Sequence, residues 1–248
     1  MAVTSMRNRP VKKRNQMRIE ILTEDKSGSV AVEKLIRLIC LNEGIDADLY
    51  VRPHRGCGSL PQDWSVKPHR FASALLELLP AKCRAYNEAL KGTDAVLIVI
   101  MDSDDNDPDV LKRELSLVCQ KYAPDLKAVI GLCIEEVESW LLGDHEALEK
   151  AYPDYDREAL AAYKQDSVCG TWETLCRVVC PDTCERIIDI GYPAIGEYKA
   201  RWSKAITRYL KPENNLSPSF KAFRKSFLYS VKMGNEPVKR PKVHTRTF

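Results

Sequence analysis

The residues best placed for chemistry follow an apolar run in the middle of the chain. Residues 95–101 have the sequence AVLIVIM, and four aspartates come soon after them: Asp102, Asp104, Asp105 and Asp107. A short run rich in Val and Ile predicts a strand buried on both faces, and carboxylates at its C-terminal end lie where open α/β sheets bind ligands. Because crowded carboxylates repel one another, a hard divalent cation is their natural partner. The alternative is a solvated strand-to-helix turn, since Asp and Asn also favour turns.

Acidic residues also follow two other predicted strands. Residues 17–23 alternate enough to form a first strand, which ends just before Glu24. Residues 127–134 predict a further buried strand, and three glutamates come after it: Glu135, Glu136 and Glu138. A second predicted strand at 46–51 leads into a loop with glycines and positive charge, where backbone N–H groups and Arg55 can approach a phosphate.

Helical patterns separate these strands. We expect helices at about 29–44, at about 69–90 with an interruption near Pro80, and at 110–122. Strands that alternate with helices predict an α/β fold with a mainly parallel sheet and helices on both faces. Right-handed crossovers place the C-terminal ends of parallel strands at one edge, so the acidic residues and the basic loop are expected to converge there.

The last third of the chain changes in character. Residues 151–230 carry helical stretches and little strand signal, which predicts a C-terminal helical subdomain after an α/β domain at 18–150. Three phenylalanines recur at helical spacing and are expected in the core rather than on a base-stacking platform: Phe220, Phe223 and Phe227. Lys221 lies on the other face of the same predicted helix and can contact either phosphate or solvent.

Charge is distributed unevenly along the chain. The formal net charge is only +3, but both ends are basic, and we interpret 1–17 as a basic disordered tail and 231–248 as a second basic tail. Basic tails on a near-neutral body suggest contact with a polyanion such as DNA or RNA. The alternative is that the tails are solubilising extensions.

The nine cysteines, without a secretion signal, predict reduced thiols in a cytoplasmic protein. No apolar run approaches the roughly 18 residues of a membrane span, so no membrane partner is expected. Four cysteines raise the question of a zinc site: Cys169, Cys176, Cys180 and Cys184. Their spacing does not match paired C-x-x-C ligands, and small buried core residues are the favoured interpretation.

The order of these motifs resembles the TOPRIM (Rossmann-like) domain of topoisomerases, bacterial primases and overcoming-lysogenization-defect (OLD) nucleases. The segments ILTEDKSG, HRGCGSLP, VIMDSDDND and IEEVESWLLGD look most like a small stand-alone TOPRIM-like family of unknown function, related to the OLD nucleases. The more specific signs are Glu138–Asp144 and Ser217–Phe220, and the resemblance covers roughly residues 18–227.

The resemblance implies roles for particular acids. Glu24 matches a glutamate proposed as general acid/base or metal ligand, Asp102 and Asp104 match a D-x-D pair that holds magnesium, and Glu138 matches a later acid of the nuclease branch. These four form the expected catalytic set. The expected ligands of Mg, or of Mn in its place, are Glu24, Asp102, Asp104, Glu136 and Glu138.

Three basic residues are the expected contacts to the substrate. The expected substrate-binding residues are Lys26, Arg55 and Lys221. The chain departs from the pattern at Cys57, where related loops often have Lys. This departure removes a phosphate-stabilising charge unless Arg55 or Lys26 supplies it.

These features suit phosphodiester hydrolysis, because metal ions can neutralise a phosphate and activate water. No tyrosine nucleophile domain or primase zinc module is apparent, which disfavours strand passage and primer synthesis. We therefore expect a metal-dependent nuclease, and the resemblance implies the effector of a bacterial anti-phage defence system that works with an ATPase partner. Residues 1–248 contain no G-x-x-x-x-G-K-[ST] phosphate loop, so any ATP use lies elsewhere. The alternatives are a non-catalytic module that binds nucleic acid or an ATPase, and an enzyme acting on small phosphoesters.

Overall fold

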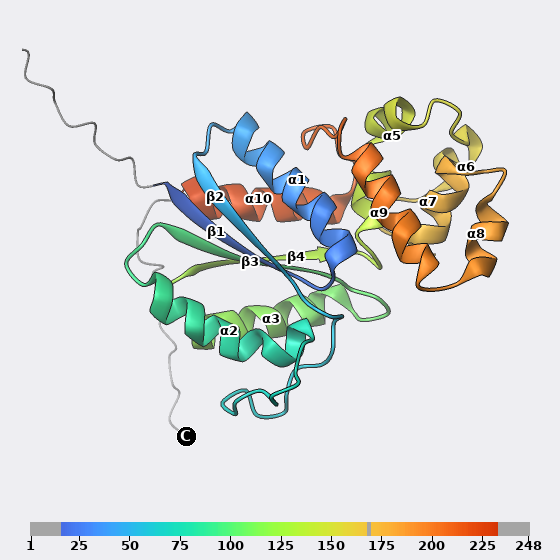
Figure 1. Ribbon diagram of the computed structural model, residues 1–248. Coiled ribbons are helices and arrows are strands. Elements are labelled where there is room, and N and C mark those ends of the chain that lie inside the picture. Colours follow the sequence, from blue (N-terminus) through green and yellow to red (C-terminus); the bar gives the residue numbers. More distant parts are fainter. Residues whose placement is uncertain (1–15, 168–169, 233–248) are drawn as a thin grey trace, which may run out of the picture.

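A four-stranded parallel sheet lies at the centre of the computed structural model, which describes residues 16–167 and 170–232 (Figure 1). In the order β2-β1-β3-β4 across the sheet, the strands are Ala47–Pro53, Met17–Thr23, Ala95–Asp102 and Lys127–Cys133. β3 is an inner strand and is buried from Ala95 to Met101, as its uninterrupted apolar sequence predicts. The predicted α/β fold with a parallel sheet is confirmed.

Helices cover both faces of the sheet (Figure 1). The helices on one face are α1 (Lys26–Asn42) and α10 (Pro218–Lys232), and those on the other are α2 (Leu75–Leu90) and α3 (Pro108–Tyr122). Successive side chains of β3 point to opposite faces of the sheet, as they do along any strand. Ile98 and Ile100 join the core beneath α1 and α10, whereas Leu97 and Val99 join the core beneath α2 and α3.

The helix predicted at about 69–90 was wrong at its beginning and at its interruption. α2 begins only at Leu75 and continues through Pro80. Pro80 is buried, so its packing offsets the one helical hydrogen bond that proline cannot donate. The residues before Leu75 form part of an irregular loop that begins after β2.

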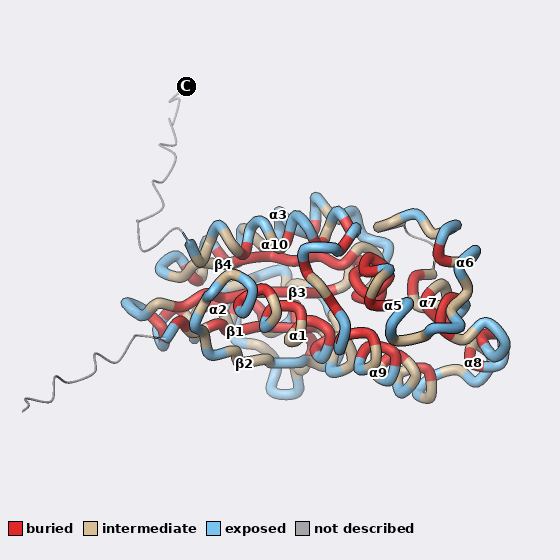
Figure 2. The backbone as a smooth tube through the Cα atoms, turned by 90° about the horizontal axis from the view of Figure 1, so that it is seen from above, coloured by how far each residue is buried: buried red, intermediate tan, exposed pale blue. Residues whose placement is uncertain are grey.

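A cluster of short helices lies beyond the C-terminal edge of the sheet (Figure 1). Its members are α5 (His145–Ala151), α6 (Arg157–Ala162), α7 (Thr171–Val179), α8 (Cys184–Ile190) and α9 (Ala194–Ile206), and α4 (Glu138–Leu142) connects them to β4. The described part of 151–230 thus contains helices and no strand. Its last helix, α10, leaves the cluster and packs against β4, and the buried residues of the cluster are continuous with the core beneath α1 and α10 (Figure 2).

The cluster is joined to the sheet around Trp140, a fully buried residue of α4. The Trp140 Nε1–H donates to Ser219 Oγ at 2.9 Å, and the indole ring stacks on Phe223 with 5.3 Å between centroids. The two segments that carry the family resemblance most specifically, 138–144 and 217–220, therefore contact each other. Most of their residues support packing rather than chemistry.

Other core predictions can be compared with the structure. Phe220, Phe223 and Phe227 are buried, which confirms that they belong to the core. Cys176 and Cys184 are buried free thiols, as expected of core residues, whereas Cys180 is only partly buried. Cys169 lies outside the described residues.

The ends of the chain contribute two ion pairs to the fold. Arg18 Nε–H donates to the fully buried Glu20 at 2.8 Å, and Lys232 Nζ lies 2.6 Å from Glu43 Oε2. Arg18 belongs to β1, and apart from Lys232 the basic residues of the two predicted tails lie outside the described part of the chain. None of the described helices is both long enough and apolar enough to cross a lipid bilayer.

We expect Gly143→Ala to destabilise the joint around Trp140. A Cβ atom at this position would lie 2.2 Å from Asn215 Oδ1 and 3.1 Å from the backbone nitrogen of Ser217, so this packed region would have to shift. Urea denaturation should show a loss of about 1–3 kcal/mol in the free energy of unfolding. The control is Gly196→Ala on α9, where a Cβ would meet no atom within 4 Å and helix propensity should improve. Equal losses in both variants would contradict the packing described.

Candidate functional site

Acidic residues end three neighbouring strands at one edge of the sheet. Glu24 follows β1, Asp102 ends β3, and Glu135 comes shortly after β4, which lies next to β3. The segments after β3 and β4 stay paired beyond the strands. The Asp104 N–H donates to the Glu135 carbonyl at 3.1 Å, and the Glu135 N–H donates to Ser103 Oγ at 2.9 Å. The predicted convergence of acidic strand ends is therefore present.

Glu24 and Asp102 line one small cavity at this edge. Its volume is about 20 Å³, which is enough for a single water molecule or ion. Oε2 of Glu24 is buried, and it has no hydrogen-bond partner among the residues that the structure describes. An unsatisfied buried carboxylate oxygen is costly, so its presence indicates a position for a ligand.

Burial and mutual repulsion make these acids hard to ionise together. Burial and then the charge of Asp104 raise the pKa of Glu24 to about 7. Burial, followed by the charges of Glu138 and Glu24, raises the pKa of Asp102 well above its usual value. Burial and the neighbouring charge of Asp105 also raise the pKa of Asp104. A cation at this edge would relieve the repulsion among all of them.

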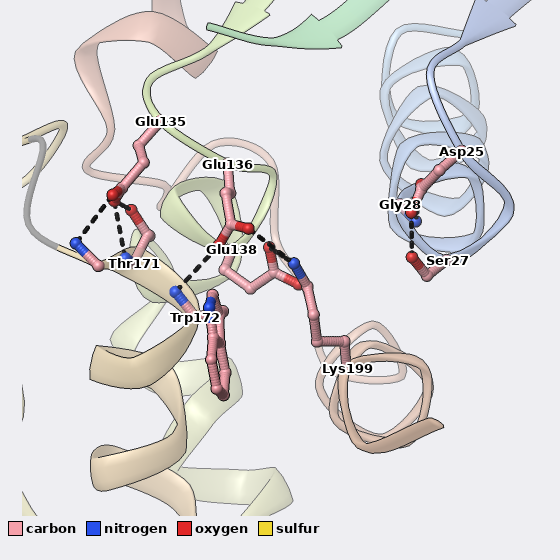
Figure 3. Close-up of polar contacts among 10 residues, drawn as sticks. Asp25, Ser27, Gly28, Glu135, Glu136, Glu138, Thr171, Trp172 and Lys199 are labelled. Carbon is pink, nitrogen blue, oxygen red and sulfur yellow. Dashed lines mark hydrogen bonds and ion pairs between the residues drawn. The ribbon is translucent and has the colours of Figure 1, made fainter. Parts of the chain in front are cut away.

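Two nearby aspartates have structural roles. Asp25 accepts a hydrogen bond from the Gly28 N–H at 2.7 Å and caps α1, which therefore begins at Lys26, slightly before the predicted start (Figure 3). Asp107 accepts from the Asp109 N–H at 2.9 Å and caps α3. The turn interpretation of the acidic segment is therefore correct for Asp107.

The first two glutamates after β4 hold the N-terminus of α7. Glu135 accepts hydrogen bonds from the Gly170 N–H at 2.9 Å and the Thr171 N–H at 2.7 Å, and also from the Thr171 hydroxyl (Figure 3). Glu136 Oε2 accepts from the Trp172 N–H at 3.2 Å. These contacts attach the helical cluster to the site edge through helix N–H groups, which favour a negative partner.

Lys199 of α9 provides a positive charge that the sequence analysis did not predict. Its Nζ lies 3.0 Å from Glu136 Oε1 and 3.3 Å from Glu138 Oε2, and the side chain is largely buried (Figure 3). The charges of Glu138 and Glu136 outweigh burial and raise the pKa of Lys199, so the amine stays protonated. Burial raises the pKa of Glu138, and Lys199 opposes that effect.

A signal for Lys199 does exist in the sequence. Ile195, Trp202 and Ile206 are buried residues of α9, and they recur at helical spacing with Lys199 on the same face. A lysine on the apolar face of an amphipathic helix needs a partner, because a buried charge is paired or neutralised. Finding the partner required the fold, since Glu136 and Glu138 lie far away in the sequence.

The predicted substrate-binding residues come from three separate elements. Lys26 is the first residue of α1, Arg55 lies in the loop after β2, and Lys221 belongs to the first turn of α10. All three are exposed. Cys57 is half-buried, and burial together with the charge of Glu24 raises the pKa of its thiol to about 12. Among the described cations, Lys199 rather than Lys26 or Arg55 is the one whose charge most lowers the pKa values of Glu24 and Asp102.

The donor atoms suit a hard divalent cation, although they do not enclose one. Carboxylate oxygens are the ligands that Mg²⁺ and Mn²⁺ prefer. Among the described residues, no group of three or more His, Cys, Asp or Glu side chains is arranged to hold a metal ion. Mg²⁺ commonly uses one or two carboxylates and completes its shell with water and substrate phosphates. Glu24 and Asp102 fit a site of that kind, whereas both oxygens of Glu136 already have partners.

Comparisons with protein-family models, with curated proteins and with solved structures found no match to this chain. Function is therefore inferred from the residues at this edge of the sheet.

The raised pKa of Glu24 predicts pH-dependent stability. A carboxyl whose pKa is higher in the folded chain stabilises the fold most below its unfolded value of 4.5, and this contribution is lost as the pH rises through about 7. In a chelator, the melting temperature should fall between about pH 5 and about pH 8. Glu24→Gln should reduce that fall, whereas Glu114→Gln, at an exposed position of α3, should not. Identical profiles for Glu24→Gln and the wild type would contradict the assigned environment.

Lys199→Met should leave two buried carboxylates without their counter-charge. We expect a loss of about 3–5 kcal/mol in the free energy of unfolding at neutral pH, measured by urea denaturation. Adding Glu138→Gln should restore part of the loss, because one of the uncompensated charges is then removed. Lys204→Met, at an exposed position of the same helix, is the control. If both lysine variants were equally stable, the ion pairs of Lys199 would make no net contribution to the free energy of unfolding.

Proposed function

We propose that this chain is a metal-dependent nuclease that hydrolyses phosphodiester bonds. The proposal is carried by the placement of Glu24 and Asp102, at the ends of the adjacent strands β1 and β3, around one small cavity. One buried oxygen of Glu24 lacks a partner among the described residues. Such crowding of carboxylates costs stability, and costs of this kind are typical of functional sites.

Glu24, Asp102 and Asp104 are the residues that would hold Mg²⁺ or Mn²⁺. A bound ion supplies charge neutralisation at the phosphate and activation of water. Without a bound cation the pKa of Glu24 is about 7; a bound cation would lower it, so that Glu24 would be ionised and able to accept a proton near neutral pH. Lys199 reduces the negative charge that Glu136 and Glu138 would otherwise present to an anionic substrate.

The remaining elements of the proposal have separate support. Glu138 is the first of the charges that raise the pKa of Asp102, which supports a place for it beside the metal ligands. The basic ends of the chain support DNA or RNA as the substrate. An ATPase partner and a role in anti-phage defence are supported by the TOPRIM-like resemblance alone.

A second candidate function is a non-catalytic TOPRIM-like module that binds nucleic acid or an ATPase. Lys199 favours it, because an internal ammonium already compensates Glu136 and Glu138. In that case the acids at the sheet edge would serve mainly to attach the helical cluster. Binding of nucleic acid in a chelator, with no cleavage under any divalent ion, would distinguish this module from a nuclease.

The nuclease proposal predicts cleavage of DNA or RNA with Mg²⁺ or Mn²⁺ and none in a chelator. Glu24→Gln should lower the rate by about 10²- to 10⁴-fold, the range for loss of a general acid or base. Asp102→Asn should abolish cleavage at ordinary metal concentrations, because the metal ion loses a charged ligand. The assay would follow end-labelled single strands and duplexes on denaturing gels.

Asp107→Asn is the matched control for this experiment. It changes an aspartate of the same acidic segment, but asparagine caps helices as well as aspartate does, so α3 and the cleavage rate should be preserved. Cleavage that is unchanged in Asp102→Asn would remove the proposed role of the site.

A further inference from the structure

A long loop between β2 and α2 contains no helix or strand. It spans residues 54–74, and irregular loops longer than about 15 residues are uncommon unless they are functional or disordered. Its two ends are fastened together, since the Arg55 N–H donates to the Ser73 carbonyl at 3.0 Å and the Leu75 N–H donates to the Gly56 carbonyl at 3.0 Å. Its middle is held by Arg84, which donates to the Trp64 carbonyl at 2.7 Å.

The 54–74 loop and α2 enclose a groove. Its volume is about 380 Å³, within the range of sites that bind small molecules or parts of larger ones. The apolar part of its wall includes Pro61, Val66, Phe71 and Pro80. Phe71 is 71% exposed and Val66 is 59% exposed, so two large apolar side chains of the wall face solvent.

One guanidinium and one imidazole lie against the aromatic ring of this groove. The guanidinium of Arg70 lies 4.4 Å from the Phe71 ring centroid, and the His69 ring lies 5.4 Å from it. Lys67 also lines the groove, and among the described residues neither Lys67 nor Arg70 forms an ion pair with an acid. Glu77 is the acid in the described lining. The wall therefore combines an exposed aromatic face with unpaired positive charge.

The groove begins close to the candidate active site. The Gly56 N–H donates to the Glu24 carbonyl at 3.0 Å. Ser59, which lines the groove, follows three residues later, so at most about 10 Å of extended chain separates Gly56 from Ser59. A strand that presents one phosphate to Glu24 and Asp102 can thus extend toward the groove.

We propose that this groove binds a base of single-stranded nucleic acid, with Phe71 as the stacking surface and Lys67 and Arg70 as contacts to the flanking phosphates. The proposal rests on the nuclease function above and names its substrate class. Paired bases are already stacked within a duplex, whereas an unpaired base can stack on an exposed aromatic side chain. The combination of positive charge and aromatic surface is the usual construction of sites for single strands.

The test is binding of a fluorescently labelled oligothymidylate of about 16 nucleotides, and of a duplex of the same length, measured by anisotropy in a chelator. The wild type should bind the single strand more tightly than the duplex. Phe71→Ala should weaken binding of the single strand roughly tenfold, the loss expected for one stacked base. Lys67→Ala and Arg70→Ala should each lower the slope of log affinity against log salt by about 0.7.

Matched controls are Tyr229→Ala, an exposed aromatic residue of α10, and Lys112→Ala, an exposed lysine of α3. Both should bind as the wild type does, and melting temperatures should confirm that Phe71→Ala is folded. Wild-type affinity in Phe71→Ala, or equal affinity for single strand and duplex, would overturn the proposal and leave the groove to another occupant such as a protein segment.

The chelator separates this proposal from the nuclease function. Binding that depends on Phe71 but is never followed by cleavage would leave the groove assigned and remove the proposed catalysis. Metal-dependent cleavage that does not depend on Phe71 would support the proposed catalysis and remove the assignment of the groove.

Discussion

Repulsion among the carboxylates at one edge of the sheet must be offset by the groups that surround them. Parallel strands end on the same side, so an acid at the end of each strand brings like charges together. Most of these acids are compensated within the chain: Asp25 and Asp107 cap helices, Glu135 binds the N-terminus of α7, and Lys199 pairs with Glu136 and Glu138. Glu24, Asp102 and Asp104 also have raised pKa values but form no ion pair with Lys or Arg among the described residues, so an external cation would relieve their repulsion.

The helical cluster is part of this compensation. α7 supplies backbone N–H groups and α9 supplies an ammonium, so both helices are held where the sheet is most negative. The joint around Trp140 then fixes the cluster through apolar packing against α10, which itself lies on the sheet. The helical cluster is therefore held to the sheet in two ways, by polar contacts of α7 and α9 with the acidic edge and by apolar packing around Trp140. Different residues provide the two kinds of contact.

Much of the fold could be predicted from local patterns. The apolar run at 95–101 determines a buried strand, and parallel topology then implies that Glu24 and Asp102 meet. Contacts between distant segments could not be predicted in this way. The pairing of Lys199 depends on how α9 approaches the edge, and the roles of Glu135 and Glu136 depend on α7. The groove beside Phe71 depends on the path of an irregular loop, for which no periodic pattern exists.

Lys199 also determines what a change of solvent can do to the protein. A divalent ion can be removed by a chelator, but an ammonium attached to α9 cannot be, and its burial limits screening by salt. Glu136 and Glu138 thus keep their counter-charge when a chelator removes divalent ions, so the attachment of the helical cluster does not depend on metal. Under the proposed metal-binding role, Glu24 and its aspartate neighbours would be the part of the edge that responds to ions in the surroundings.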